Sequence, residues 1–166
     1  GVNWIYGFNH AEAIVCFSKA LEADPGCAMA HWGIAYASGP NYNLPWELYD
    51  DRGRAKALAT AYDAKEAALA LKDGMTSCEQ ALIEAIAARY PERDPVDEME
   101  AWDSAFANAM RDVFHQFPEN LNVRSIFVES LMDLTPWKMW DLKSGNPAEG
   151  AATREAQEAL EHALGT

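Results

Sequence analysis

Residues 9–38 restrict the fold of this chain most strongly, because two helical patterns stand there with a very short joint between them. The first pattern is an apolar stripe at α-helical spacing, formed by Ala13, Ile14, Phe17, Ala20 and Leu21. Asn9 and Glu12 suit the start of this helix as capping residues. The run 24–26, Asp-Pro-Gly, ends it because proline cannot continue a helix. A second helix is predicted at about 27–38, and two helices joined so closely lie antiparallel.

The same stretch carries small and aromatic residues in a pattern that resembles a tetratricopeptide repeat. The pattern reads Ala13-x3-Phe17-x2-Ala20-x4-Pro25, followed by a helix with small Ala35 in its middle. In that family this spacing belongs to the second helix and turn of one repeat and to the first helix of the next. Alanine lets neighbouring helices approach, phenylalanine fills the gap and proline sets the turn. The resemblance implies an all-α fold, a right-handed α-solenoid of antiparallel helix hairpins, and says little about chemistry.

Further helical patterns cover the rest of the chain, with irregular loops at 39–51 and 135–150. Residues 1–8 look like the end of a helix, and other helices are predicted at about 53–71, 77–90, 95–117, 121–134 and after 150. Near the end, Ala156-x3-Leu160-x2-Ala163 restates the pattern of the first hairpin. We expect about seven helices in one tetratricopeptide-like domain over 1–166, which starts and ends inside a repeat and has lengthened middle repeats.

The composition is that of an ordered and strongly acidic protein. Apolar residues make up 49% of the chain, which places it among globular proteins. Its net charge of −13 repels nucleic-acid phosphates and anionic membrane surfaces, so neither is expected as a partner. No apolar run is long enough to span a bilayer and no leader opens the chain, so we expect a soluble protein and favour the cytoplasm over a secreted or periplasmic location.

The cysteines do not suggest a disulfide framework, because the chain has only three of them, Cys16, Cys27 and Cys78. One bridge between Cys16 and Cys27, across the first hairpin, is an open alternative. The alternative that we favour is buried or half-buried thiols in a reducing compartment.

The resemblance also implies a binding groove, because in tetratricopeptide proteins the first helix of each hairpin lines a concave surface that holds a peptide or a protein terminus. Placed through the Pro25 and Pro118 turns, the groove residues are Met29, Trp32 and Tyr36, and then Asn122, Ser125, Glu129 and Met132. An aromatic strip beside polar groups suits peptide binding, since aromatic side chains give contact area at little entropic cost. The alternative is that Trp32 and Tyr36 pack under the 39–51 loop.

His10, Glu12 and His31 form the one candidate cluster with acid–base or metal-binding character. Cys27 stands one helical turn before His31, which places a thiol and an imidazole on one helix face. A metal-dependent or small-molecule enzyme built on this cluster is the alternative to an interaction module. The simpler interpretation is a polar end of the hairpin, since Glu12 already serves as a capping residue, and we predict no catalytic residue, metal or cofactor.

The two irregular loops have the same pair of interpretations. Asn41, Asn43 and Trp46 in the first loop can form a ligand-binding loop, or the loop can cover the end of the hairpin. Trp137 and Trp140 in the second loop leave the same two alternatives open.

Apolar residues near both ends of the chain favour self-association, because terminal repeats of a solenoid normally carry polar caps. These residues are Val2, Trp4 and Ile5 at one end and Leu160 and Leu164 at the other. Head-to-tail packing of copies would cover both ends and yield a homo-oligomer, as a ring or a fibre. The sequence therefore predicts a non-catalytic interaction or assembly module whose partner is a protein or a peptide.

Overall fold

The computed structural model describes residues 1–164, with side chains up to residue 161. Within these residues all regular elements are helices: α1 (Val2–Tyr6), α2 (His10–Ala23), α3 (Ala28–Ser38), η1 (Trp46–Leu48), α4 (Asp51–Leu71), η2 (Lys72–Gly74), α5 (Ser77–Arg89), α6 (Glu100–Gln116), α7 (Leu121–Met132) and α8 (Thr153–Leu164). The predicted all-α class is confirmed for this part of the chain. None of these helices is long and apolar enough to cross a membrane.

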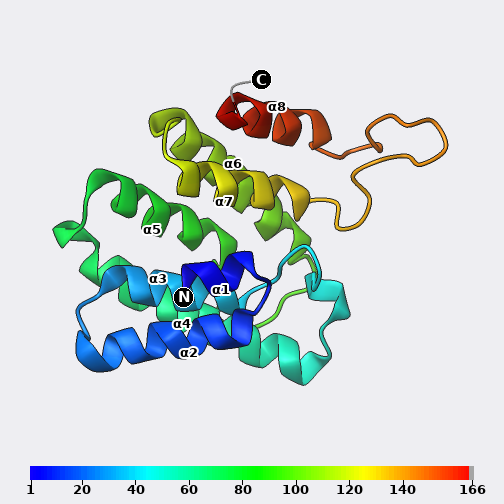
Figure 1. Cartoon of the computed structure of the whole chain (residues 1–166). Coiled ribbons are helices and arrows are strands. Elements are labelled where there is room, and N and C mark those ends of the chain that lie inside the picture. The colour runs from blue at the N-terminus through cyan, green and yellow to red at the C-terminus, as the bar shows by residue number, and fades with distance from the viewer. Residues whose placement is uncertain (165–166) are drawn as a thin grey trace. The chain divides into compact units, whose positions relative to one another are not determined.

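The chain forms two compact units (Figure 1). The first unit comprises Gly1–Gly39 and Tyr49–Asp97 and contains α1 to α5. The second comprises Pro40–Leu48 and the chain from Glu98 onward, and contains η1 and α6 to α8. The organisation as a single domain stays a prediction.

The predicted lead hairpin is present in the first unit as α2 and α3, which pack against each other. The side chain of Asn9 caps α2 by accepting a hydrogen bond from the backbone N–H of Glu12 at 3.2 Å, as its position predicts. At the other end the chain becomes extended at Asp24, whose carboxylate accepts a bond from the N–H of Gly26 at 3.0 Å. The side chain of Asp24 therefore stabilises the short turn.

The ring of Phe17 lies against the backbone of α3 at Gly33, and this contact sets the spacing of the hairpin. A Cβ atom built on Gly33 would lie 2.4 Å from the ring, far inside contact distance, so only glycine leaves room there. Glycine in the middle of a helix costs about 1 kcal/mol relative to alanine. Gly33 is therefore explained by packing, and Phe17 fills the gap between helices as the sequence pattern predicts.

Helix α3 lies at the centre of the first unit, where it packs against α2, α4 and α5. Most of its residues are buried, as expected of a helix that is apolar on all sides. The indole N–H of Trp32 donates a hydrogen bond to the carbonyl of Leu82 on α5 at 3.1 Å, and its ring stacks on Tyr36 at 5.1 Å between centroids. Ala61 and Ala68, in the small-residue stripe of α4, are fully buried.

One expectation about the chain is wrong. Helix α6 begins at Glu100 and not near Pro95, because residues 91–98 are all exposed and give the first turns nothing to pack against, whereas Met99 is buried. The favoured expectation for the cysteines is confirmed: Cys16, Cys27 and Cys78 are free and half-buried, and no bridge joins Cys16 and Cys27. Cys16 lies in the middle of α2, whereas Cys27 stands at the start of α3, beyond the turn.

In the second unit α7 packs against both α6 and α8. Its buried residues, Val123, Ile126, Phe127 and Leu131 among them, recur at helical spacing. On α6 the apolar side chains of Phe106, Met110 and Val113 are buried, and on α8 the small side chains of Ala156 and Ala159. The packing of α7 against both neighbours therefore joins the three helices of this unit.

Replacing Gly33 by alanine is expected to lower the free energy of unfolding by about 1 kcal/mol. Overpacking against the Phe17 ring costs about 1–3 kcal/mol, and the better helix propensity of alanine returns about 1 kcal/mol. Urea unfolding of the purified chain measures the change. Gly74→Ala is the control, because a Cβ there meets nothing within 4 Å. In a Phe17→Leu background the same Gly33→Ala change should become neutral or stabilising; an unchanged penalty would contradict the contact.

Candidate functional site

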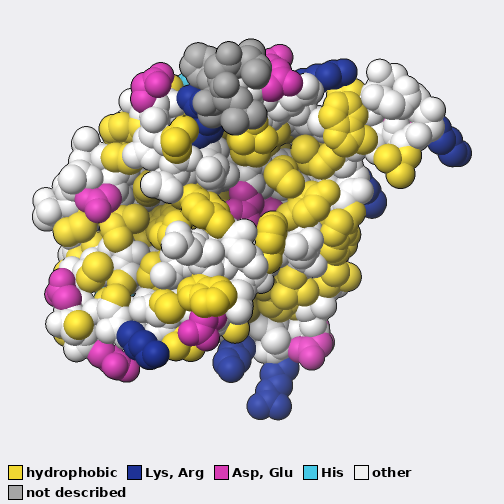
Figure 2. All heavy atoms as spheres, in the orientation of Figure 1, with side chains coloured by type: hydrophobic (Ala, Val, Ile, Leu, Met, Phe, Trp, Pro, Cys, Tyr) yellow, Lys and Arg dark blue, Asp and Glu magenta, His cyan; other side chains and the backbone are white. Residues whose placement is uncertain are grey.

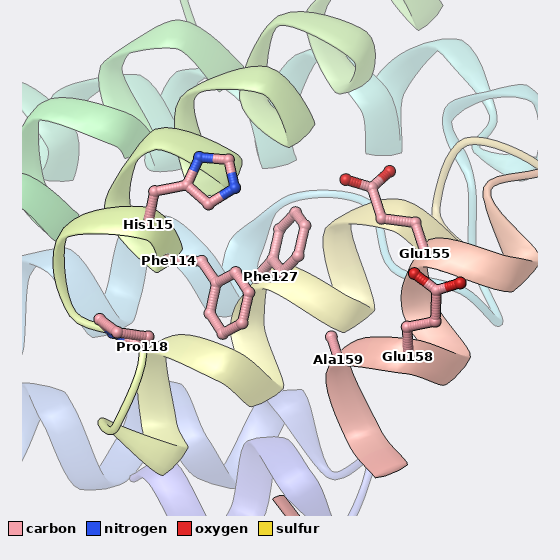
Figure 3. A pocket seen from close by; sticks show the side chains of 7 residues that line it. All are labelled: Phe114, His115, Pro118, Phe127, Glu155, Glu158 and Ala159. Atoms are coloured by element: carbon pink, nitrogen blue, oxygen red, sulfur yellow. The ribbon is translucent and has the colours of Figure 1, made fainter. Parts of the chain in front are cut away.

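A hollow of about 450 Å³ opens on the second unit, where the end of α6 and the start of α7 face α8. Its lining combines aromatic, small and acidic side chains: Phe114, His115, Pro118, Phe127, Glu155, Glu158 and Ala159 (Figure 3). The two phenylalanine rings lie between the α6–α7 turn on one side and α8 on the other (Figure 3). The sequence pattern alone did not single out this site.

The floor of the hollow is a stacked pair of rings. Phe114 of α6 and Phe127 of α7 stack at 4.9 Å between centroids with 15° between their planes. Phe127 is buried and Phe114 is half-buried, so Phe114 supplies the accessible part of the aromatic surface. The guanidinium of Arg124 lies 5.6 Å from the Phe114 ring centre and adds a cation–π contact. The ring pair is therefore held rigidly before any ligand arrives.

The turn between α6 and α7 follows from its own sequence. α6 ends at Gln116, and the N–H of the next residue, Phe117, donates to the carbonyl of Val113. The side chain of Asn120 caps α7 by accepting bonds from the N–H groups of Asn122 and Val123. Arg124 donates to the carbonyl of Pro118 at 2.6 Å. These bonds fix the wall of the hollow that Pro118 forms.

An ion pair ties α8 to α6 beside the hollow. Arg111 donates two hydrogen bonds to Glu155, from Nε to Oε1 at 2.6 Å and from an Nη to Oε2 at 3.0 Å. These bonds hold the pKa of the Glu155 carboxyl below its ordinary value of 4.5 and raise the pKa of Arg111. A contact with two hydrogen bonds of this kind keeps Glu155 ionised and also fixes the position of α8 relative to α6.

Glu158 differs from its neighbour Glu155. It is exposed at the rim, and within the described side chains it forms no ion pair. The hollow thus offers an apolar floor with one available carboxylate above it. Such a site suits an apolar side chain that is accompanied by a positive charge.

The predicted polar cluster does not come together. His10 and Glu12 lie in the first turn of α2, whereas Cys27 and His31 lie at the start of α3, where His31 Nε2 is 3.4 Å from the carbonyl of Pro25. Because the helices are antiparallel, these groups stand at opposite ends of the hairpin, about 20 Å apart for a helix of 14 residues. Within the described residues no three His, Cys, Asp or Glu side chains are arranged to hold a metal ion. The alternative of a shared site at His10, Glu12 and His31 is therefore wrong.

The predicted groove residues differ in how accessible they are. In the first unit Trp32 and Tyr36 are buried in the core between α3 and α5, so a partner cannot reach them, and Met29 is half-buried. The indole N–H of Trp32 is buried and needs an acceptor, which the carbonyl of Leu82 on α5 supplies. In the second unit one side of α7 carries an exposed Asn122 and the half-buried Ser125, Glu129 and Met132. Binding by these α7 residues stays a prediction.

Both irregular loops contribute aromatic contacts within the second unit. Asn41 and Trp46 are buried and Asn43 is exposed, and the Asn41 side chain accepts a bond from the N–H of Asn43. This arrangement agrees better with a structural role for the first loop than with a ligand-binding one. Trp137 and Trp140 in the second loop are exposed, and Trp137 meets Tyr42 edge to face at 6.4 Å.

The residues predicted for self-association are mostly accessible. Val2 and Trp4 on α1 and Leu160 on α8 are exposed, Ile5 is buried against α2, and Leu164 lies outside the described side chains. Three more exposed apolar residues were missed in the sequence: Tyr6 at the end of α1, Phe8 just after it and Val15 on α2. Hydrophobic atoms are visible at the surface over α1 (Figure 2).

Comparisons with protein-family models, curated proteins and solved structures find no match to this chain. The interpretation of the hollow therefore depends on its geometry and chemistry.

Replacing Glu155 by glutamine removes the ion pair with Arg111. Because the folded pKa of Glu155 is lowered, the pair stabilises the fold fully above pH 4.5 and loses this effect as the pH falls through the lower folded value. Both side chains are partly exposed, so we expect a loss of about 0.5–1 kcal/mol at neutral pH and none at a pH well below 4.5. Urea unfolding at the two pH values measures it. Glu158→Gln is the control, and an equal pH-dependent loss there would contradict the assignment.

Proposed function

We propose that this chain is a non-catalytic interaction module of the tetratricopeptide kind, whose hairpins stack as a right-handed α-solenoid and which binds a segment of a protein partner in the hollow of the second unit. The observation that carries the proposal is the rigid pair of Phe114 and Phe127 beneath an open, acid-rimmed hollow.

The chemistry of the hollow supports a peptide-like ligand. Concave sites with an apolar lining and few polar groups are where proteins bind such ligands. The half-buried ring of Phe114 offers contact area, and its supports, Arg124 and the α6–α7 turn, leave little freedom to lose on binding. Glu158 selects for a partner that places a positive charge near its apolar anchor. The net charge of −13 favours a basic segment in the same way.

The packing of the lead hairpin supports the family resemblance. The contact of Phe17 with Gly33 gives the aromatic residue of the pattern the gap-filling role that the resemblance assigns to it. α3 and α5 pack side by side within the first unit, as the first helices of successive repeats do in a solenoid.

Self-association through α1 is a second candidate, favoured by the exposed apolar group of Val2, Trp4, Tyr6, Phe8 and Val15. Large exposed apolar patches commonly mark an interface, and hydrophobic atoms lie at the surface over α1 (Figure 2). The head-to-tail arrangement predicted from the sequence would place this surface against α8 of another copy, near Leu160.

Peptides selected from a phage-displayed random library on the wild-type chain are expected to carry an aromatic or aliphatic residue next to Lys or Arg. Glu158→Lys should weaken their binding by about 10-fold or more, because it replaces attraction by repulsion at the rim. Glu161→Lys makes the same charge change one turn further along α8 and should have a smaller effect. Isothermal titration calorimetry measures both. Failure to select peptides, or equal binding to Glu158→Lys, would contradict the proposal.

Trp4→Asp tests the second candidate, because a charge in the centre of the α1 surface opposes burial against another copy. If copies associate through α1, the variant should have a dissociation constant for self-association that is higher by about 10-fold or more. More of it is then monomeric at a given concentration. Light scattering coupled to size-exclusion chromatography measures the mass. Leu48→Asp, at another exposed apolar residue, is the control and should behave as the wild type. The same mass for Trp4→Asp and the wild type would rule this interface out.

A further inference from the structure

The loop between α7 and α8 projects away from the helices of its unit (Figure 1, orange). Its outer part, residues 137–148, is called the projecting loop below. Asp141 organises the projecting loop: its N–H donates to the carbonyl of Asn146 at 2.8 Å, and its carboxylate accepts bonds from the N–H of Lys143 and the hydroxyl of Ser144 at 2.9 and 2.7 Å. Gly145 supplies the left-handed turn, with φ of 71°. The loop is therefore an ordered projection.

The base of the projecting loop is attached to the first turn of α8. Thr153 donates a hydrogen bond from its hydroxyl to the carbonyl of Met139, and Arg154 lies over the ring of Trp140 at 5.4 Å. Ala148 donates from its N–H to the same Met139 carbonyl, at 3.1 Å. Because the base is fixed, the tip loses little freedom when it docks.

The tip presents an apolar side chain and a positive charge side by side. Leu142 is 94% exposed, far more than the other exposed large hydrophobic residues of the described chain. Lys143 follows it and is also exposed. The projecting loop carries two bases, Lys138 and Lys143, against one acid, Asp141, although the chain as a whole has a net charge of −13. The tip is thus a basic and apolar projection on an acidic protein.

The tip and the hollow are complementary. The hollow offers the Phe114 ring for an apolar side chain and the Glu158 carboxylate for a cation, and the tip offers Leu142 and Lys143 in adjacent positions. The projecting loop points away from the three helices that carry the hollow (Figure 1), so the tip does not serve the hollow of its own copy.

We propose that the Leu142–Lys143 tip of one copy docks in the hollow of a second copy. Leu142 packs on Phe114, and Lys143 pairs with Glu158. The proposal rests on the proposed function, since it names the occupant of the same hollow. Two different surfaces meet in this contact, so the first copy keeps its hollow free and the second keeps its tip free, and further copies can join into rings or open chains. Local charge complementarity at the contact outweighs the general repulsion between acidic copies, which salt screens.

Sedimentation velocity at increasing concentration, up to the millimolar range, tests the proposal on the full chain. The wild type is expected to form dimers and larger species. Leu142→Asp and Lys143→Glu should each weaken association by about 10- to 100-fold, whereas Leu48→Asp and Lys19→Glu, which make the same changes at other exposed positions, should not. Circular dichroism verifies that each variant is folded.

A charge exchange makes the test specific. Lys143→Glu and Glu158→Lys should each be monomeric alone, because tip and hollow then carry like charges. An equimolar mixture should associate again, since each tip finds a hollow of opposite charge. Failure of the mixture to associate, or association of either variant alone as strong as that of the wild type, overturns the proposal. Association that persists in Leu142→Asp but is lost in Trp4→Asp also overturns the proposal, because it assigns the contact between copies to α1.

The outcomes separate this proposal from the proposed function. A wild-type chain that remains monomeric, but whose hollow captures library peptides in a Glu158-dependent way, overturns the second copy as occupant and leaves the interaction module in place. A monomeric chain that captures no peptide in the hollow overturns both.

Discussion

The contact between the Phe17 ring and the backbone of Gly33 is the constraint on which the first unit depends. It brings α2 close to α3 and so makes α3 a central helix, enclosed by α2, α4 and α5. Once enclosed, α3 must satisfy its polar atoms internally, and Trp32 does so by donating to a carbonyl of α5. A close approach permitted by one glycine therefore determines which aromatic side chains become core.

The second unit is held by polar bonds as well as by apolar packing. The two hydrogen bonds from Arg111 to Glu155 join α6 to α8, and the stacked rings of Phe114 and Phe127 join α6 to α7. Arg111 therefore neutralises the charge of Glu155, whereas the carboxylate of Glu158 stays available to a ligand. The same bonds that fix the helices thus determine the chemistry of the hollow, which combines a rigid aromatic floor with a single acidic rim group.

Much of the fold could be predicted because its determinants are local. Asn9, Thr76 and Asn120 cap helices where their sequence positions indicate, with Glu79 completing a capping box at Thr76. The irregular loops and the lead hairpin follow from proline, glycine and helical spacing in the same way. The start of α6 could not be predicted locally, because a suitable proline and several acids precede it, and the helix begins only where Met99 finds a surface to bury against.

The candidate site shows the limit of sequence reasoning. His10 and His31 looked like partners because they flank one hairpin, but an antiparallel pair of helices places their starts at opposite ends. Arg111 and Glu155 meet although 44 residues separate them, and no periodicity indicates such a pair. The sequence by itself determined the helices, their caps and the lead hairpin, since these depend on neighbours within one or two turns. Only the tertiary structure decided which side chains are buried and which carboxylate stays available, because burial and charge pairing depend on contacts between residues distant in the chain.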